Sequence, residues 1–403
     1  MEYWRKNLYV LWGTQFLAMM GMNLVVPFLP FYLRHLGVTN EQELARWSGL
    51  VFSGPFLVAF FMAPIWGTLG DRYGQKLMVV RALFGLGVSQ FLIGLATSPL
   101  QVFIFRMVQG GISGFIASAL TLVSITTPKH KQGYALGILQ SASSAGTVLG
   151  PLFGGVMVDL VGYRELFFII TAICTAGGFI VIALVEDVRP EDRPVHKYTV
   201  IDNYRFVLTS PYLRIVALTI LLSQGAILII EPLFALYIET MTQRTQYIAT
   251  LAGVIFSIAG VFMVISAPWW GKQNDRKGTT KRNLLISIST TSVMYFLHTI
   301  VASLVQLSFL RAILGFARGG ILPALYSVTS VHTPAQRRGG VMGIAASFTV
   351  LGNMIGPLAG GYIASEIGIV SCFYFTTAIL ILTTLFVYYR LPAAASRQDQ
   401  GAE

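Results

Sequence analysis

Long apolar runs follow one another along the whole chain, separated by short stretches of charged and turn-forming residues. Each run reaches the roughly 20 residues that a helix needs to cross the hydrocarbon core of a bilayer. The first run has no small-residue cleavage pattern, so we expect it to stay in the protein as a helix. The pattern predicts twelve membrane-spanning helices, at residues 8–33, 47–70, 77–97, 100–127, 134–159, 166–186, 212–240, 248–271, 283–303, 305–332, 340–365 and 370–391.

Composition supports the same class of protein. Of the 403 residues 55% are hydrophobic and 11% are charged, whereas soluble domains average about 25% charged residues. This excludes a soluble enzyme, a disordered chain and a disulfide-rich secreted domain. The two cysteines, Cys174 and Cys372, stand far apart inside apolar runs, so we expect small core residues and neither a disulfide nor a metal site.

The formal net charge of +11 is explained by membrane topology. If the predicted loops alternate between the two faces, 21 of the 28 lysines and arginines lie on one face, four lie on the other, and Arg106, Arg311 and Arg318 lie inside predicted spans. The positive-inside rule then places both termini and the central loop in the cytoplasm. The partner of this surface is the lipid bilayer, and nucleic acid is excluded.

The chain contains an internal repeat, which is a primary guide to fold. Landmarks recur in the same order at offsets of 204 to 206 residues: Gly67–Lys76 with Gly271–Gly278, Arg106 with Arg311, Pro128 with Pro334, Gly150–Gly155 with Gly356–Gly361, and Pro27 and Tyr32 with Pro232 and Tyr237. The repeat predicts an all-α membrane protein built from two parallel six-helix bundles, at residues 1–186 and 212–391. A cytoplasmic linker, 187–211, joins the bundles, and a cytoplasmic tail, 392–403, follows them.

Three motifs resemble those of the major facilitator superfamily, whose halves are parallel repeats. The first follows the second predicted helix and comprises Gly67, Asp71, Arg72, Gly74 and Lys76. The second is Arg106-x-x-Gln109-Gly110. The third resembles the motif of the antiporter branch and comprises Gly146, Gly150, Pro151, Gly154 and Gly155. The resemblance is to the drug:proton antiporter group of bacterial multidrug exporters. It implies a multi-pass protein of the inner membrane that contributes to antibiotic resistance, is driven by the proton gradient and has no cofactor.

The motifs also have physical interpretations. Gly146, Gly150 and Gly154 lie on one helix face and allow a neighbouring helix to approach closely, while Pro151 bends the helix. This arrangement is either static packing or a seam that works during transport. Asp71 and Arg72 are expected in a turn made by Gly70 and Gly74. They form either a solvated loop or a gate in which Asp71 meets the positive end of a helix.

Charges inside the spans are the most informative residues, because an uncompensated one is costly in a bilayer. Glu231, Arg311 and Arg318 are expected at similar depths, and the resembled fold would turn them toward one cavity. Glu231 is our candidate for proton coupling, with a static ion pair to Arg318 as the alternative. Snorkelling to the outer surface is the alternative for Arg106 and Arg311. The candidate substrate-binding residues are Asn23, Arg106, Gln109, Gln140, Gln224, Arg311, Arg318 and Asn353.

Together with the resemblance, which alone implies the proton coupling, these residues lead us to expect proton-coupled efflux of amphipathic small molecules, drug-like or anionic, by a monomeric transporter rather than an enzyme. The first predicted helix has Gln15 and Asn23, and no acid, at depth, so the predicted cavity carries more positive than negative charge and organic cations are less natural substrates. His298 is expected to be a packing residue. Open alternatives are an exporter of one metabolite such as a siderophore, a lipid-handling facilitator, an uptake transporter, and a membrane sensor or scaffold that transports nothing.

Overall fold

The computed structural model describes residues 2–112, 114–186, 199–242, 247–274 and 279–392, and every regular element in these ranges is helical. The second copy of the loop motif at residues 275–278, most of the predicted linker and residues 393–403 of the predicted tail lie outside them. Contacts between Cα atoms divide the chain into two compact units. The bundle boundaries from sequence stay a prediction.

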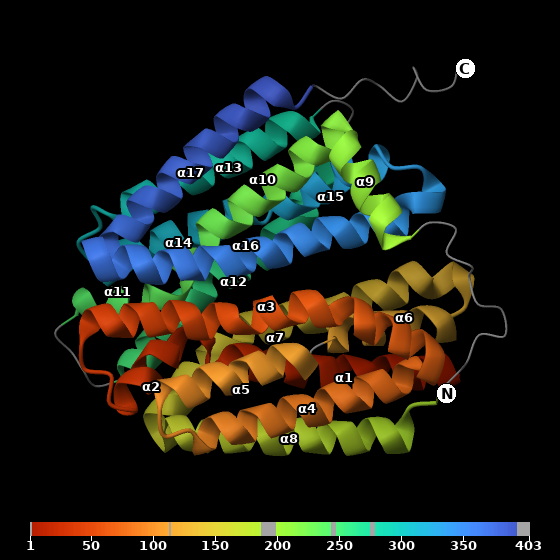
Figure 1. Ribbon diagram of the computed structural model, residues 1–403, viewed down its shortest axis with the longest axis horizontal. Helices are drawn as coiled ribbons and strands as arrows, with labels where there is room; N and C mark the ends of the chain where they lie inside the picture. Colours follow the sequence, from red (N-terminus) through yellow and green to blue (C-terminus); the bar gives the residue numbers. More distant parts are fainter. Residues whose placement is uncertain (1, 113, 187–198, 243–246, 275–278, 393–403) are drawn as a thin grey trace. The chain divides into compact units, whose positions relative to one another are not determined.

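The first unit comprises residues up to Pro194 together with Phe234–Ser257. Within it α1 packs along α7 and α8, α4 packs along α8, and α3 packs along α5 (Figure 1). Its helices are α1 (Tyr3–Leu24), η1 (Val26–Phe28), α2 (Leu29–His35), α3 (Glu41–Tyr73), α4 (Gln75–Leu95), α5 (Pro99–Ile112), α6 (Phe115–Thr126), η2 (Lys129–Lys131), α7 (Gln132–Val161), α8 (Tyr163–Leu184), α11 (Phe234–Thr240) and the first part of α12 (Ile248–Asn274).

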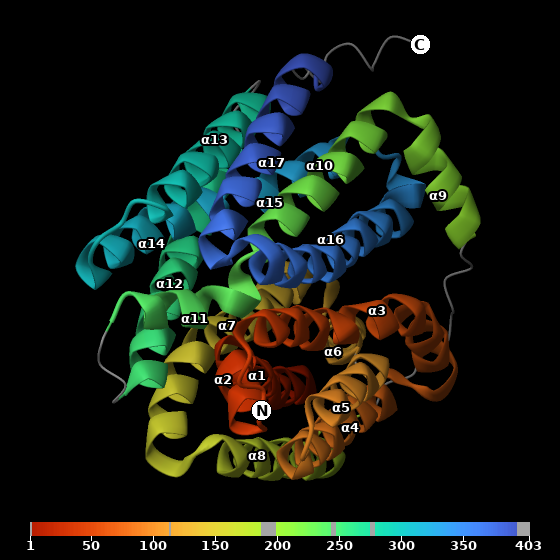
Figure 2. The same ribbon diagram turned by 60° about the vertical axis from the view of Figure 1, so that its left-hand side comes forward.

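The second unit comprises Val195–Leu233 and Ile258–Glu403. Here α10 packs along α16, and α13 packs along both α17 and α14 (Figure 2). Its helices are α9 (Val200–Thr209), α10 (Pro211–Leu228), η3 (Glu231–Leu233), the rest of α12, α13 (Thr280–His298), α14 (Leu304–Arg318), α15 (Ile321–Val331), η4 (Ala335–Arg337), α16 (Arg338–Ile367) and α17 (Ile369–Arg390). The two main pairs repeat those of the first unit, in which α1 packs along α7 and α4 along α8.

Eleven helical segments of the described chain are long and apolar enough to cross a membrane. The remaining predicted span, the ninth at residues 283–303, corresponds to α13, which has 19 residues and is therefore about 28 Å long, close to the thickness of a bilayer core. Its middle, from Ser287 to Ser292, is rich in serine and threonine, which lowers its hydropathy. Most of the polar side chains there are buried within the unit, so packing rather than average hydropathy accounts for this helix.

Four spans that the sequence predicts as continuous are interrupted, the first and seventh about two thirds of the way along and the fourth and tenth near their middles. In the first and seventh predicted spans the break is a 3-10 turn containing Pro27 or Pro232. In the fourth and tenth the break lies at Gly114, whose φ is +120°, and at Gly319. Pro27 and Pro232 stand 205 residues apart, and so do Gly114 and Gly319. The helix breaks therefore follow the internal repeat. Proline lacks the amide donor that a helix needs, and glycine alone adopts such a positive φ without strain.

Short helix α9 lies within the segment that the sequence assigned to the linker. The side chain of Thr199 accepts a hydrogen bond from the amide of Asp202, and the Asp202 carboxylate accepts one from the Thr199 amide. This reciprocal capping box fixes the helix start. Val207 packs with Leu213 of α10 and Val341 of α16, so α9 is anchored to the second unit.

Candidate functional site

Glu231 and Arg318 form a buried ion pair in the second unit. Nη1 of Arg318 donates a hydrogen bond of 2.6 Å to Oε1 of Glu231, and Glu231 is 5% exposed. The helix break places the carboxylate here, because Glu231 begins η3 after α10 has ended. Its second oxygen, Oε2, has no hydrogen-bond partner. The carboxylate of Glu231 therefore has one oxygen in the ion pair and one buried oxygen without a hydrogen bond.

Arg311, Tyr295 and His298 surround this pair. Arg311 stands seven residues before Arg318 and so lies on the same face of α14. It is 1% exposed and interacts electrostatically with Glu231, Tyr295 and Arg318. Nδ1 of His298 donates a hydrogen bond to the Met294 carbonyl oxygen, and its ring stacks on Phe373. One carboxylate thus faces two arginines, which leaves a net positive charge in this group.

Sequence reasoning did not select Tyr295. The signal was present, because a tyrosine in a span needs a partner for its hydroxyl, and Tyr295 is completely buried. His298 is also completely buried, and its ring contacts fit the packing role expected for it. Both residues belong to α13, the least hydrophobic of the predicted spans.

Arg106 of the first unit occupies the position equivalent to Arg311 in the repeat, but it has different neighbours. Its Nη1 donates a 2.6 Å hydrogen bond to Oε1 of Gln109, and its Nε donates a weak one of 3.4 Å to the Val51 carbonyl. No carboxylate of the described chain pairs with it. Arg106 is 8% exposed. The snorkelling alternative is therefore wrong for Arg106, and also for the more deeply buried Arg311.

The uncharged candidates are placed in four different ways. Asn23 donates to the Met19 carbonyl of its own helix, and its Cβ lies against Gly150. Gln140 is exposed on α7. Gln224 lies beside Gly352 across the α10–α16 contact, and the neighbouring Asn353 keeps a buried Oδ1 without a partner. Gln109 is buried and directly contacts Arg106.

The glycines of the antiporter-type motif make a close helix contact, here called the glycine seam (Gly146, Gly150 and Gly154 against α1). A Cβ added at Gly154 would lie 2.0 Å from the Leu24 carbonyl oxygen, and one at Gly146 would lie 2.6 Å from the Phe16 oxygen. Gly155 faces Ala249 of α12 instead, and the carbonyl of Pro151 faces Gly253. The motif thus joins α7 to two helices, whereas the sequence suggested one neighbour.

The loop motif differs from the predicted turn. Helix α3 continues to Tyr73, so Asp71 and Arg72 occupy its last turn, and Gly74, with a φ of +101°, makes the turn alone. The side chain of Gln75 donates to Asp71 at 3.4 Å, and Lys76 donates to the Ile182 carbonyl. The Cβ of a residue at Gly67 would meet nothing within 4 Å, whereas one at Gly70 would contact Gln75. The expectation of a turn made by Gly70 and Gly74 was wrong at Gly70, because the helix continues through this residue to Tyr73.

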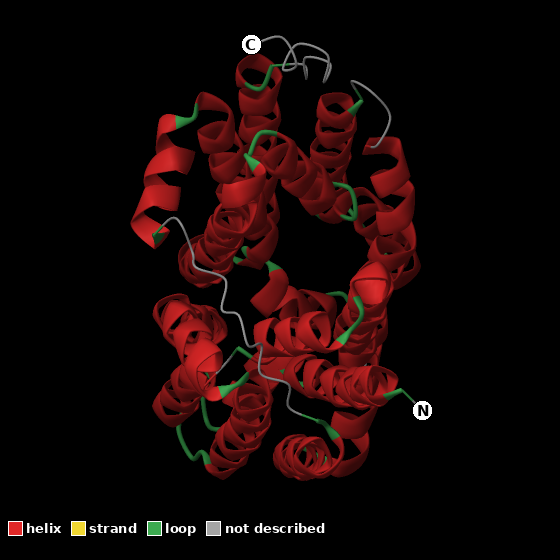
Figure 3. Ribbon diagram, turned by 90° about the vertical axis from the view of Figure 1, so that its right-hand side faces the viewer, coloured by secondary structure: helices red, strands yellow, loops and turns green. Residues whose placement is uncertain are grey.

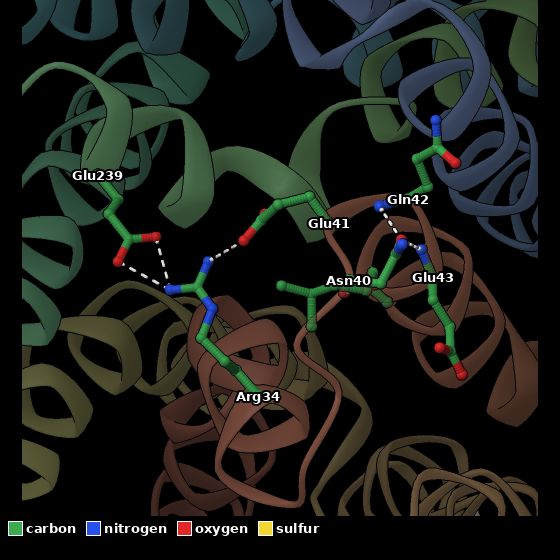
Figure 4. A network of polar contacts seen from close by, with 8 residues as sticks. Arg34, Asn40, Glu41, Gln42, Glu43 and Glu239 are labelled. Carbon is green, nitrogen blue, oxygen red and sulfur yellow. Dashed lines mark hydrogen bonds and ion pairs between the residues drawn. The ribbon is translucent and has the colours of Figure 1, made fainter.

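An ionic cluster that sequence reasoning missed ties α2 to α3 and α11 (Figure 4). Nη1 of Arg34 donates to both carboxylate oxygens of Glu239, at 2.8 and 2.9 Å, and Nη2 donates to Glu41 at 3.0 Å. Nearby, Asp159 of α7 accepts from the backbone amide and the hydroxyl of Thr250 at the start of α12. Arg34 and Glu239 stand 205 residues apart, which is the repeat offset, so equivalent positions carry opposite charges and pair.

Two kinds of comparison identify the family. Residues 11–272 and 232–403 match the model of the Major Facilitator Superfamily. Multidrug resistance protein MdtG of Escherichia coli, in strain K12 / DH10B and in the O1:K1 / APEC strain, is 35% identical over 393 residues, covering 96% of this chain and 95% of MdtG. The chain belongs to the major facilitator superfamily. It is a multi-pass membrane transporter and not an enzyme.

Solved structures of other transporters share the fold. A bacterial homolog of the human lysosomal transporter Spinster, crystallised in an inward-facing and occupied conformation, has a TM-score of 0.80 with 14% identity, covering 98% of both chains. The nucleoside transporter NupG also has a TM-score of 0.80 with 14% identity, covering 96% of this chain and all of NupG. The human organic anion transporter MFSD10 has a TM-score of 0.69 with 17% identity, covering 96% and 100%. The expected fold class, a helical major facilitator protein, is confirmed (Figure 3).

Proposed function

We propose that this transporter exports amphipathic small molecules across the bacterial inner membrane in exchange for protons, with both termini in the cytoplasm. Its likeness to MdtG, a multidrug resistance protein, supports multidrug efflux. The observation that carries the proton coupling is the buried Glu231–Arg318 pair. Glu231 is an acid within a span, at a helix break, and it forms a direct ion pair with Arg318.

The pair provides a two-state device for one proton. While Arg318 touches Glu231, the ion pair favours the carboxylate, whereas separation in a desolvated site favours the protonated acid. If substrate binds best to the conformation with the pair closed, binding shifts the population toward that state and expels the proton. Substrate export and proton entry then alternate, and the substrate and the proton do not have to bind to the same atoms of the transporter.

The other motifs are assigned supporting roles in this proposal. The glycine seam lets α1 move against α7 without side chains in between. Asp71 and the loop motif act as the gate at the cytoplasmic side. The Arg34–Glu239 pair acts as a gate at the opposite ends of the spans. The substrate contacts are Asn23, Arg106, Gln109, Gln140, Gln224, Arg311, Arg318 and Asn353.

The experiment is an accumulation screen in bacterial cells that lack their major efflux pumps. Fluorescent dyes and antibiotics of positive, negative and zero charge are tested with the wild type, with Glu231→Gln, and with and without a protonophore. We expect cells with the wild-type transporter to accumulate less of the exported compounds than cells with Glu231→Gln. This difference in accumulation should disappear when the protonophore is added. Export that persists at full rate in the protonophore would overturn proton coupling, and raised accumulation would indicate uptake.

A further inference from the structure

The two halves of the repeat treat their equivalent arginines differently. In the second unit Arg311 and Arg318 share the carboxylate of Glu231. In the first unit the position 205 residues before Glu231 is Val26, which has no charge. Arg106 has no carboxylate partner among the described residues, although it is more than nine-tenths buried. The first unit therefore contains a buried cation for which the described chain supplies no counter-charge.

The side-chain amide nitrogen of Gln109, next to Arg106, also lacks an interaction partner. Gln109 turns Oε1 toward Nη1 of Arg106, and this orientation leaves its Nε2 buried without an acceptor. Nη2 of Arg106 also has no acceptor among the hydrogen bonds of the described residues, since only Nη1 and Nε donate. Nε2 of Gln109 is thus a buried donor without an acceptor, which is unfavourable. Beside it, Nη2 of Arg106 is a second donor that no described residue uses.

We propose that Arg106 and Gln109 form a binding site for a monoanionic group. Such a group would accept hydrogen bonds from Nη2 of Arg106 and Nε2 of Gln109 and would neutralise the guanidinium. It has two possible sources, a free halide or the carboxylate of an organic molecule. The second source rests on the proposed function and assigns anionic amphiphiles as one class of its substrates. The site lies within one unit and does not involve Glu231.

The Gln109→Leu variant removes the amide donor, and leucine is the residue that the other repeat has at the equivalent position, Leu314. Arg106→Gln removes the charge. Arg106→Lys keeps the charge but removes the fork of two donors, so it tests the site if Arg106→Gln does not fold. Gln42→Leu, the same change at an exposed position of α3, is the matched control.

The assay is thermal unfolding of the purified transporter in a neutral detergent, at constant ionic strength with sodium sulfate as the baseline salt, because sulfate is a dianion and carries no carboxylate. Cys174 and Cys372 are free and buried, so a thiol-reactive fluorophore reports unfolding. The probes are chloride, benzoate and benzylammonium, the last having the same ring as benzoate with the opposite charge. We expect chloride or benzoate, and not benzylammonium, to raise the melting temperature in a saturable way.

Gln109→Leu should weaken the apparent affinity for that anion about fivefold, as expected for one hydrogen bond. Arg106→Gln should abolish the effect, Arg106→Lys should reduce it, and Gln42→Leu should leave it unchanged. Stabilisation by benzoate alone would support an organic anion, and equal stabilisation by chloride would support a free ion. Absence of any anion effect on the wild type, or equal effects on all variants, would overturn the site. Neither result bears on proton coupling, which is measured separately.

Discussion

Substituting Gly154 by alanine tests whether the glycine seam is as tight as the structure has it. The added Cβ would lie 2.0 Å from the carbonyl oxygen of Leu24, whereas Cβ contacts below 3.0 Å are essentially never seen. The seam must therefore open by about 1 Å, and the obstacle is backbone, which no rotamer change can relieve. Overpacking of this kind costs about 1–3 kcal/mol.

The same helix provides the control. A Cβ at Gly137 would meet nothing within 4 Å, so Gly137→Ala should gain stability, by up to about 1 kcal/mol, from helix propensity alone. Gly154→Ala gains the same stability from helix propensity but also overpacks the glycine seam. The free energies of unfolding of the two variants should therefore differ by about 1–3 kcal/mol. For a unit of roughly 200 residues each kcal/mol corresponds to about 2–4 °C in melting temperature.

The second repeat allows an independent replication. A Cβ at Gly360 would lie 1.9 Å from the Ile229 carbonyl oxygen, and one at Gly343 would contact nothing. Gly360→Ala and Gly343→Ala should therefore reproduce the difference. Melting is followed with a thiol-reactive fluorophore, because both cysteines are buried. Equal melting temperatures for Gly154→Ala and Gly137→Ala would refute the packing argument.

Three further predictions concern charged residues. Asp71→Asn should abolish export while the protein still inserts in the membrane, as measured by dye efflux and membrane immunoblot; efflux at the wild-type rate would remove Asp71 from the gate. Arg34→Glu and Glu239→Arg should each slow transport, and the double exchange should restore much of it; a double variant no better than the worse single one would contradict a direct ion pair. Hydrogen bonds from Thr199 hold the pKa of Asp202 below its ordinary value of 3.8, so its stabilisation of α9 should be present above that pH and disappear as the pH falls through the lowered pKa. Hydrogen exchange of α9 should show this loss in the wild type and not in Asp202→Asn, and exchange that is independent of pH in this range, after correction for the intrinsic rate, would contradict it.

The sequence was sufficient to predict the helices and the repeat, because both are set by long apolar runs and by residues at a fixed offset. It did not predict the breaks at Gly114 and Gly319, since a single glycine is compatible with a continuous helix and only packing decides. The end of α3 was misplaced for a similar reason, because Gly70 remains helical.

The candidate site was predictable where a residue is unusual in a membrane. Glu231 and Arg318 were selected as charges within spans, and the structure places them in contact. The Arg34–Glu239 pair was missed because each residue lies near a helix end, where a charge is ordinary, and pairing depends on contacts between distant segments. Gln140 was selected for its polarity, but it is exposed, and the phase of a helix cannot be fixed from one polar residue.

Proton release on substrate binding tests the central proposal most directly. The purified transporter is placed in weakly buffered detergent solution with a pH-sensitive dye, and a compound found by the accumulation screen is added. We predict proton release from the wild type and from Glu165→Gln, an exposed control on α8, and none from Glu231→Gln, which should still bind the compound. Equal release from the wild type and Glu231→Gln would contradict the assignment of Glu231, and binding to the wild type without any release would contradict proton antiport itself.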